Sequence, residues 1–172
     1  MSEAANRDDR YFVTDEWVGE LEGVMLRVAK NQLIKDFDAY RLLALAAAQT
    51  LMCHYFFSDS RASRRAAEEQ LLRLFDELSG KTESYEFEAL SLEEMTVASE
   101  MTSTAFALIA HRRDLVIGCD ADLSVDTLCQ GLITVMRTSC EKGGARSTAA
   151  LSGVLEGFLE LRSGTQPLHL VR

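Results

Sequence analysis

The sequence predicts an all-α fold: a single-domain bundle of about six amphipathic helices around one central apolar helix. Apolar residues recur three and four positions apart along most of the chain, which is the period of a helix. The one proline among 172 residues is Pro167, so no proline interrupts a helix before the C-terminal end. Residues 41–57 are apolar on nearly every face, as expected of a helix that others surround.

The composition is that of one globular domain, and the net charge limits the classes of partner that the domain is expected to bind. Hydrophobic residues make up 47% of the chain and charged residues 26%, close to the globular average. The net charge of −9 disfavours nucleic acid and anionic membranes and suits a basic protein partner. The first residues lack the basic and apolar pattern of a secretory signal. We therefore expect a cytoplasmic protein with four free cysteines, no cofactor and no bound metal.

The N-terminal half predicts three helices within a helical domain of residues 14–162. Residues 1–13 are polar and are expected to be loose. Thr14 is suited to cap a first helix that fades near Asn31. Asp36 or Asp38 then caps the second, although one long continuous helix is the alternative. The third helix follows the polar stretch at Ser58 to Ser60 and ends at Gly80.

The middle of the chain changes period and then returns to helix. Tyr85, Phe87 and Ala89 alternate with glutamates, which predicts a short extended segment over residues 84–89, either an edge strand or a loop. Ser91 with Glu94 three positions later forms a capping box at the start of a fourth helix. We expect residues 115–117 to be its last turn, a short strand being the alternative.

Two further helices and a tail complete the predicted fold. Ser124 is suited to cap the fifth helix, and Gly143 with Gly144 ends it. The sixth continues to residue 162, with a mobile tail at 163–172. Small residues in the sixth helix recur every fourth position, which predicts a close crossing by another helix. They are Ala149, Gly153 and Gly157.

Charge is most uneven over residues 76–100, which hold eight acidic residues and one basic residue. One interpretation is a docking face for a basic partner. The other is a solvated loop followed by a helix start, where acidic residues are favourable in any case. The partner-binding candidates are Glu83, Glu86, Glu88, Glu93 and Glu94.

Arg61, Arg64 and Arg65 near the start of the third helix are candidates for binding an anion. Cations at that end oppose the helix dipole, whereas a phosphate or carboxylate would be attracted by the free N–H groups there. The alternative, which we favour, is that Arg64 and Arg65 pair with Glu68 and Glu69 one turn later.

Hydroxyl side chains crowd the fourth helix. Short hydroxyls are mediocre helix formers, and charged residues are commoner on a solvent-facing surface. They suggest close approach by another surface, either a neighbouring helix or a second protein chain. The residues concerned are Thr96, Ser99, Thr102, Ser103 and Thr104.

No motif specifies a reaction or a metal site. Nucleophile-elbow, P-loop and dinucleotide motifs are absent. Asp120, Asp122 and Asp126 resemble the start of a calcium loop, but Val125 and Gly131 stand where glycine and glutamate are required. If a small-ligand pocket exists, we expect it between the second and fourth helices. Its lining would be Met52, Tyr55, Phe56, Met101 and Phe106, with His54 or His111 as the polar group.

The sequence therefore favours a non-catalytic protein-interaction module of the adaptor, inhibitor, immunity or chaperone type, and a homodimer. A ligand-binding or enzymatic bundle is the alternative. A dimeric regulator that binds nucleic acid through Arg61, Arg64 and Arg65 is the lesser one, since the net charge opposes it.

Overall fold

The computed structural model describes the backbone of residues 2–57, 60–79, 89–115 and 121–163, and most side chains from residue 16 to 161 within these ranges. The described chain consists of helices, with no strand among these residues. They are α1 (Ser2–Asn31), α2 (Asp36–Phe57), α3 (Arg61–Ser79), α4 (Leu92–Leu115) and α5 (Ala121–Ser163). One hydrophobic core joins them, which confirms the predicted all-α, single-domain class.

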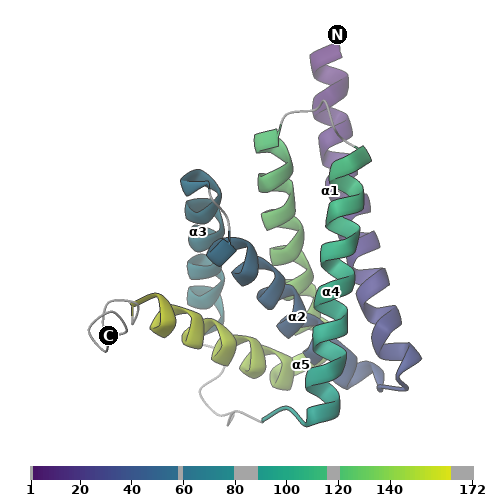
Figure 1. Ribbon diagram of the computed structural model, residues 1–172, viewed down its shortest axis with the longest axis vertical. Coiled ribbons are helices and arrows are strands. Elements are labelled where there is room, and N and C mark those ends of the chain that lie inside the picture. The colour runs from purple at the N-terminus through teal and green to yellow at the C-terminus, as the bar shows by residue number, and fades with distance from the viewer. Residues whose placement is uncertain (1, 58–59, 80–88, 116–120, 164–172) are drawn as a thin grey trace.

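Figure 1 shows how the helices are arranged. α1, α4 and the first half of α5 run lengthwise, and α2 crosses obliquely from the end of α1 toward α3. The second half of α5 turns and runs across the lower part of the molecule. α2 contacts each of the other four helices. Among the described residues, no helix combines the length and apolar character needed to cross a bilayer.

α2 is buried along its first half and more open near its end. Every residue from Arg41 to Ala48 is buried, as are Thr50 and Leu51. The alanines in this stretch are all 0% exposed. Farther along, the Phe56 side chain is 39% exposed, so the last turns are not covered on all sides. That α2 is the central helix of the bundle stays a prediction.

The described residues form five helical elements, and the last of them, α5, consists of two helical stretches that meet at a kink where the sequence predicted one helix to end and the next to begin. The predicted break at Gly143 and Gly144 lies inside α5, where Gly144 has φ 76° and ψ −159°. This backbone conformation is open essentially to glycine alone. The kink at Gly144 therefore separates two helical stretches that run in different directions, with no longer loop between them.

Several predicted boundaries differ from the structure. α1 begins at Ser2 and not at Thr14, because residues 2–13 contain no glycine or proline to stop it. That this segment is loose stays a prediction. α5 begins at Ala121, ahead of Ser124. Residues 80–88, 116–120 and 164–172 lie outside the described residues, and with them most of the predicted extended segment and nearly all of the tail.

α1 and α2 are separate helices, and a leucine closes the first of them. The Ile34 N–H donates to the Ala29 carbonyl at 3.0 Å, and the Leu33 N–H donates to the Lys30 carbonyl at 3.0 Å. This pair of bonds is a Schellman motif, whose penultimate residue is usually glycine because it is left-handed. Here that residue is Leu33, with φ 61° and a side chain that is 91% exposed.

Replacing Leu33 with glycine is therefore expected to raise the free energy of unfolding by about 0.5–1 kcal/mol. A left-handed conformation costs an L-residue about 1–2 kcal/mol, and the greater flexibility of glycine in the unfolded chain offsets part of that gain. Urea denaturation followed by circular dichroism measures the change. L33A is the control and should give no such gain, because alanine keeps the left-handed strain. Equal stabilities of L33G and L33A would contradict the prediction.

The close crossing predicted from the small residues of the sixth helix is wrong at Gly157. Among the described residues, a methyl group placed on this exposed glycine would have no atom within 4 Å outside its own stretch of helix. Spacing alone suggested a packed stripe, but Gly157 lies on the outside of α5. Nothing in the structure therefore requires glycine at this position.

We expect Gly157→Ala to raise the free energy of unfolding by about 0.5–1 kcal/mol, because alanine loses less backbone entropy in a helix and meets no neighbour here. Thermal and urea denaturation of the purified variant test this. A loss of stability would restore the crossing that the sequence suggested.

Candidate functional site

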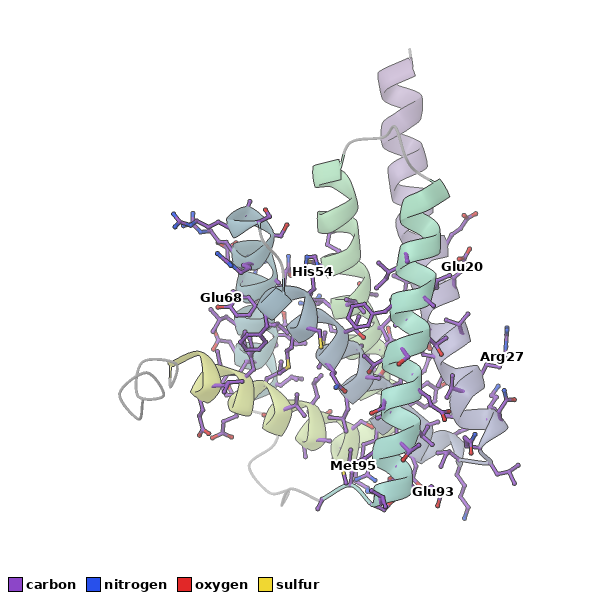
Figure 2. All side chains as sticks on the ribbon, in the orientation of Figure 1. Glu20, Arg27, His54, Glu68, Glu93 and Met95 are labelled. Atoms are coloured by element: carbon purple, nitrogen blue, oxygen red, sulfur yellow. The ribbon has the colours of Figure 1, made fainter. Side chains whose placement is uncertain are left out.

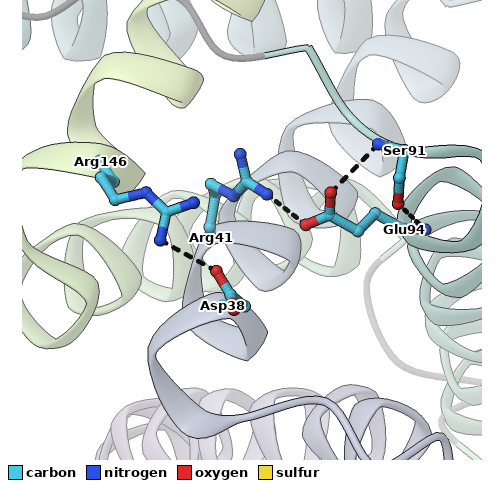
Figure 3. A network of polar contacts seen from close by, with 5 residues as sticks. All are labelled: Asp38, Arg41, Ser91, Glu94 and Arg146. Atoms are coloured by element: carbon cyan, nitrogen blue, oxygen red, sulfur yellow. Dashed lines mark hydrogen bonds and ion pairs between the residues drawn. The ribbon is translucent and has the colours of Figure 1, made fainter.

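The start of α4 is fixed by the capping box that the sequence predicted. The Glu94 N–H donates to Ser91 Oγ at 3.1 Å, and the Ser91 N–H donates to Glu94 Oε1 at 3.1 Å. The second carboxylate oxygen of Glu94 accepts a hydrogen bond from the guanidinium of Arg41, which is only 4% exposed (Figure 3). In the same region, Arg146 Nη1 donates to Asp38 Oδ1 at 3.1 Å, linking α5 to α2.

Glu94 is held ionised by this arrangement. Burial alone would raise the pKa of its carboxyl group, but the hydrogen bonds from Ser91 and the charge of Arg41 outweigh burial and lower the pKa. A carboxylate so committed to a buried arginine is part of the framework of the fold. It is poorly placed to bind a basic partner.

Among the described residues, the other acidic candidates do not form one common face. Glu93 is exposed at the lower end of α4 (Figure 2). Glu77, which lies in the acidic segment 76–100 but is not one of the candidates, accepts two hydrogen bonds from Arg137 of α5, at 2.7 and 3.0 Å. Glu83, Glu86 and Glu88 lie outside the described residues. The acidic docking face therefore stays a prediction.

The three arginines do lie together on the first turns of α3. Arg61 and Arg65 are exposed and Arg64 is half-buried. Ser60 caps this helix, its Oγ accepting a hydrogen bond from the Ser63 N–H at 3.2 Å. One of the N–H groups available to an anion is thereby already engaged.

The predicted pocket residues do not converge. Met101 is fully buried in the core, whereas Phe106, on the same helix, is 39% exposed. Five positions on a helix turn the side chain by roughly 140°, so the two face different sides. Tyr55 packs edge-on against Phe56 and Phe158, with ring centroids 5.0 and 5.2 Å away.

The polar side chains at that predicted pocket are only partly described. The Tyr55 hydroxyl donates to Glu68 Oε2 of α3 at 3.3 Å. His54 is half-buried on α2, Met52 packs against the core, and the His111 side chain lies outside the described residues. Burial raises the pKa of the Cys53 thiol, which lowers its reactivity. Within the described part of the chain, no three histidine, cysteine or acidic side chains are grouped so as to hold a metal.

The outward side of α4 carries exposed side chains without charge. Eight exposed side chains, none of them charged, follow one side of this helix over about five turns. We call them the α4 face: Leu92, Met95, Thr96, Ser99, Ser103, Phe106, Ala107 and Ala110.

The α4 face differs in charge from the exposed surface of α3, the helix that precedes α4 in the sequence. The exposed positions of α3 are mostly charged, as is usual for a helix in water. On α4 from Leu92 to Ala110, where the side chains are described, the exposed charges are Glu93 and Glu100, seven residues and two turns apart, along one edge of the face. The charged positions of α3 are Arg61, Arg65, Glu69, Arg73, Asp76 and Glu77.

The hydroxyl residues in the sequence drew attention to α4, but their spacing did not show which of them are buried and which are exposed. Thr102 is buried and donates to the Ala98 carbonyl at 3.0 Å, so it belongs to the core. Ser99 and Ser103 face outward. Met95 is 47% exposed, although it lies only three positions before the buried Ala98, and Leu92 is 78% exposed.

No protein-family model, curated protein sequence or solved structure matches this chain.

Proposed function

We propose that the chain is a non-catalytic protein-interaction module whose binding surface is the α4 face. The observation that carries this proposal is a continuous row of exposed, uncharged side chains along α4. Isolated exposed apolar residues are ordinary on a protein surface, but a row of this length is typical of a site that another protein covers. The acidic residues Glu93 and Glu100 would lie at its rim, where charge favours approach and orientation more than affinity.

Less supports the alternatives. A ligand-binding or enzymatic bundle would need a pocket, and Met101 and Phe106 lie on different sides of α4. Binding of nucleic acid would depend on Arg61, Arg64 and Arg65 against a net charge of −9. The bundle would instead act in the cytoplasm as a scaffold that keeps one helix surface rigid, with α2 at its centre.

Site-specific photocrosslinking in cells tests the proposal. A photoreactive residue replaces Ser103 in one sample and Thr134 of α5 in the other, since both are exposed hydroxyl residues within long helices. We expect an adduct of defined mass from position 103, its loss when Ser99→Arg is added, and no such adduct from position 134. Equal labelling from both positions, or none from position 103, would overturn the proposal.

A further inference from the structure

We infer that the partner of the α4 face is a second copy of this chain, with the two α4 helices antiparallel and the two-fold axis beside the midpoint between Ser99 and Ser103. This inference rests on the proposed function and names its partner. Along the centre of the face, exposed residues are spaced alternately four and three positions apart, at 92, 96, 99, 103, 106 and 110. This is the spacing at which two helices pack along a common seam.

The sizes of the side chains make the face complementary to itself only when one copy is reversed. Its first turn carries the large residues Leu92 and Met95, and its last turns carry Ala107 and Ala110. In the antiparallel register, Leu92 of each copy lies opposite Ala110 of the other, so large residues meet small ones. A parallel pair would place leucine against leucine at one end and leave a gap between alanines at the other.

The middle of the face suits close approach of the two backbones. In the same register Ser99 of one copy lies opposite Ser103 of the other. Small side chains at a helix crossing permit interaxial distances near the lower end of the usual range of about 8–10 Å. The serine hydroxyls can bond to helix carbonyls one turn back, as the Thr96 hydroxyl does to the Leu92 carbonyl at 3.0 Å, so neither needs water.

Charge along α4 favours the same orientation. The exposed acid Glu93 is in the first turn, and the sequence places His111, Arg112, Arg113 and Asp114 in the last turns, whose net charge is positive. An antiparallel pair brings the acidic end of each helix near the basic end of the other and opposes the two helix dipoles. A parallel pair would bring like ends together. The two copies of Glu100 share one rim near the axis, where exposure to water keeps their repulsion small.

Sedimentation equilibrium of the purified full chain tests the self-association. We expect the wild type and Thr134→Arg to be dimers, and Ser103→Arg to be a monomer with unchanged helical circular dichroism. The two substitutions add the same charge at exposed hydroxyl residues of different helices. A wild type that is monomeric at all accessible concentrations would overturn this inference. So would a dimer that Ser103→Arg leaves intact.

Thiol crosslinking with a short bismaleimide tests the register. Leu92→Cys and Ala110→Cys proteins are expected to crosslink when mixed and not separately, because two copies of position 92 would lie about 27 Å apart at 1.5 Å per residue. Wild type treated in parallel identifies adducts of the native cysteines, and peptide masses locate the new one. Crosslinking of Leu92→Cys with itself would overturn the antiparallel arrangement.

The outcomes separate this inference from the function on which it depends. If position 103 captures only a different protein while the wild type is a monomer, the self-association is wrong and the proposed function stands. If position 103 captures nothing and the wild type is a monomer, both are wrong. Capture of a second copy of the chain, together with mixed crosslinking of positions 92 and 110, supports both.

Discussion

Arg41→Ala is expected to lower the free energy of unfolding by about 3–5 kcal/mol, the usual loss when one member of a buried ion pair is removed. The Arg41 side chain is 4% exposed and its partner Glu94 is 20% exposed. Alanine would leave the carboxylate without its cation and would also remove the packing of the long arginine stem. The Ser91 N–H still donates to Glu94, which places the expected loss toward the lower end of this range.

The control for this substitution is Arg137→Ala. Arg137 makes a two-bond pair with Glu77, but these side chains are 41% and 42% exposed. Water and salt screen such a pair, so its loss should cost at most about 1 kcal/mol. Urea denaturation of both variants at neutral pH gives the comparison. If Arg41→Ala costs no more than Arg137→Ala, the buried pair does not hold α4 to α2.

The same pair predicts how stability depends on pH. The lowered pKa of Glu94 means that its contribution is present above the pKa of an unfolded glutamate, about 4.3, and is lost as the pH falls through the lower folded value. In Arg41→Ala, only the hydrogen bonds with Ser91 remain to lower the pKa of Glu94 against the effect of burial. The contribution of Glu94 to the free energy of unfolding should therefore begin to be lost at a higher pH than in the wild type. Denaturation curves from pH 3 to 7 should show the two profiles converging at the acidic end. Parallel profiles would contradict this account.

Local patterns predicted those features that depend on neighbouring residues. The serine and glutamate of the α4 cap were identifiable because a capping box needs residues only three positions apart. The glycine pair at 143 and 144 likewise marked the change of direction in α5. Neither pattern says what lies beside the helix. The Arg41 partner of Glu94 is 53 positions away, and nothing in the sequence connects the two.

Spacing was also unable to fix which side of a helix is buried. Each position turns the side chain by about 100°, so a residue one place from the core stripe can face water. Met95, three positions before the buried Ala98, is exposed, whereas Thr102, one of the hydroxyls expected to meet either a neighbouring helix or a second chain, is buried. The candidate site was therefore located to the right helix from its hydroxyls, but the α4 face emerged only from the folded arrangement.

Leu33 shows a different limit. Sequence rules look for glycine where a helix ends in the left-handed conformation, and a leucine there gives no warning. The stop of α1 was nevertheless expected near the right place, because the apolar stripe fades and acidic residues follow at 36 and 38. The approximate position at which α1 ends was predictable from the sequence. The residue that takes the left-handed conformation there was not.

Gly144→Ala is expected to lower the free energy of unfolding by about 1–3 kcal/mol, since a side chain at φ 76° and ψ −159° is strained whatever space surrounds it. The kink carries the second half of α5 across the bundle and brings Arg146 to Asp38 of α2. An alanine that straightened the helix would separate these residues, and one that kept the kink would retain the strain. Either response costs stability.

Gly143→Ala should destabilise for a separate reason, because its new methyl group would overlap the buried Ser147 hydroxyl and lie 2.8 Å from Ser147 Cβ and 3.0 Å from Tyr40 Cβ. Forcing such contacts apart costs about 1–3 kcal/mol. Gly157→Ala in the same helix makes the identical chemical change in open space, and it should stabilise. Urea denaturation of the three variants should therefore show a lower free energy of unfolding for Gly143→Ala and Gly144→Ala and a higher one for Gly157→Ala. Stabilisation by Gly144→Ala would mean that α5 runs straight through this position, and the second half of the helix would then lie elsewhere.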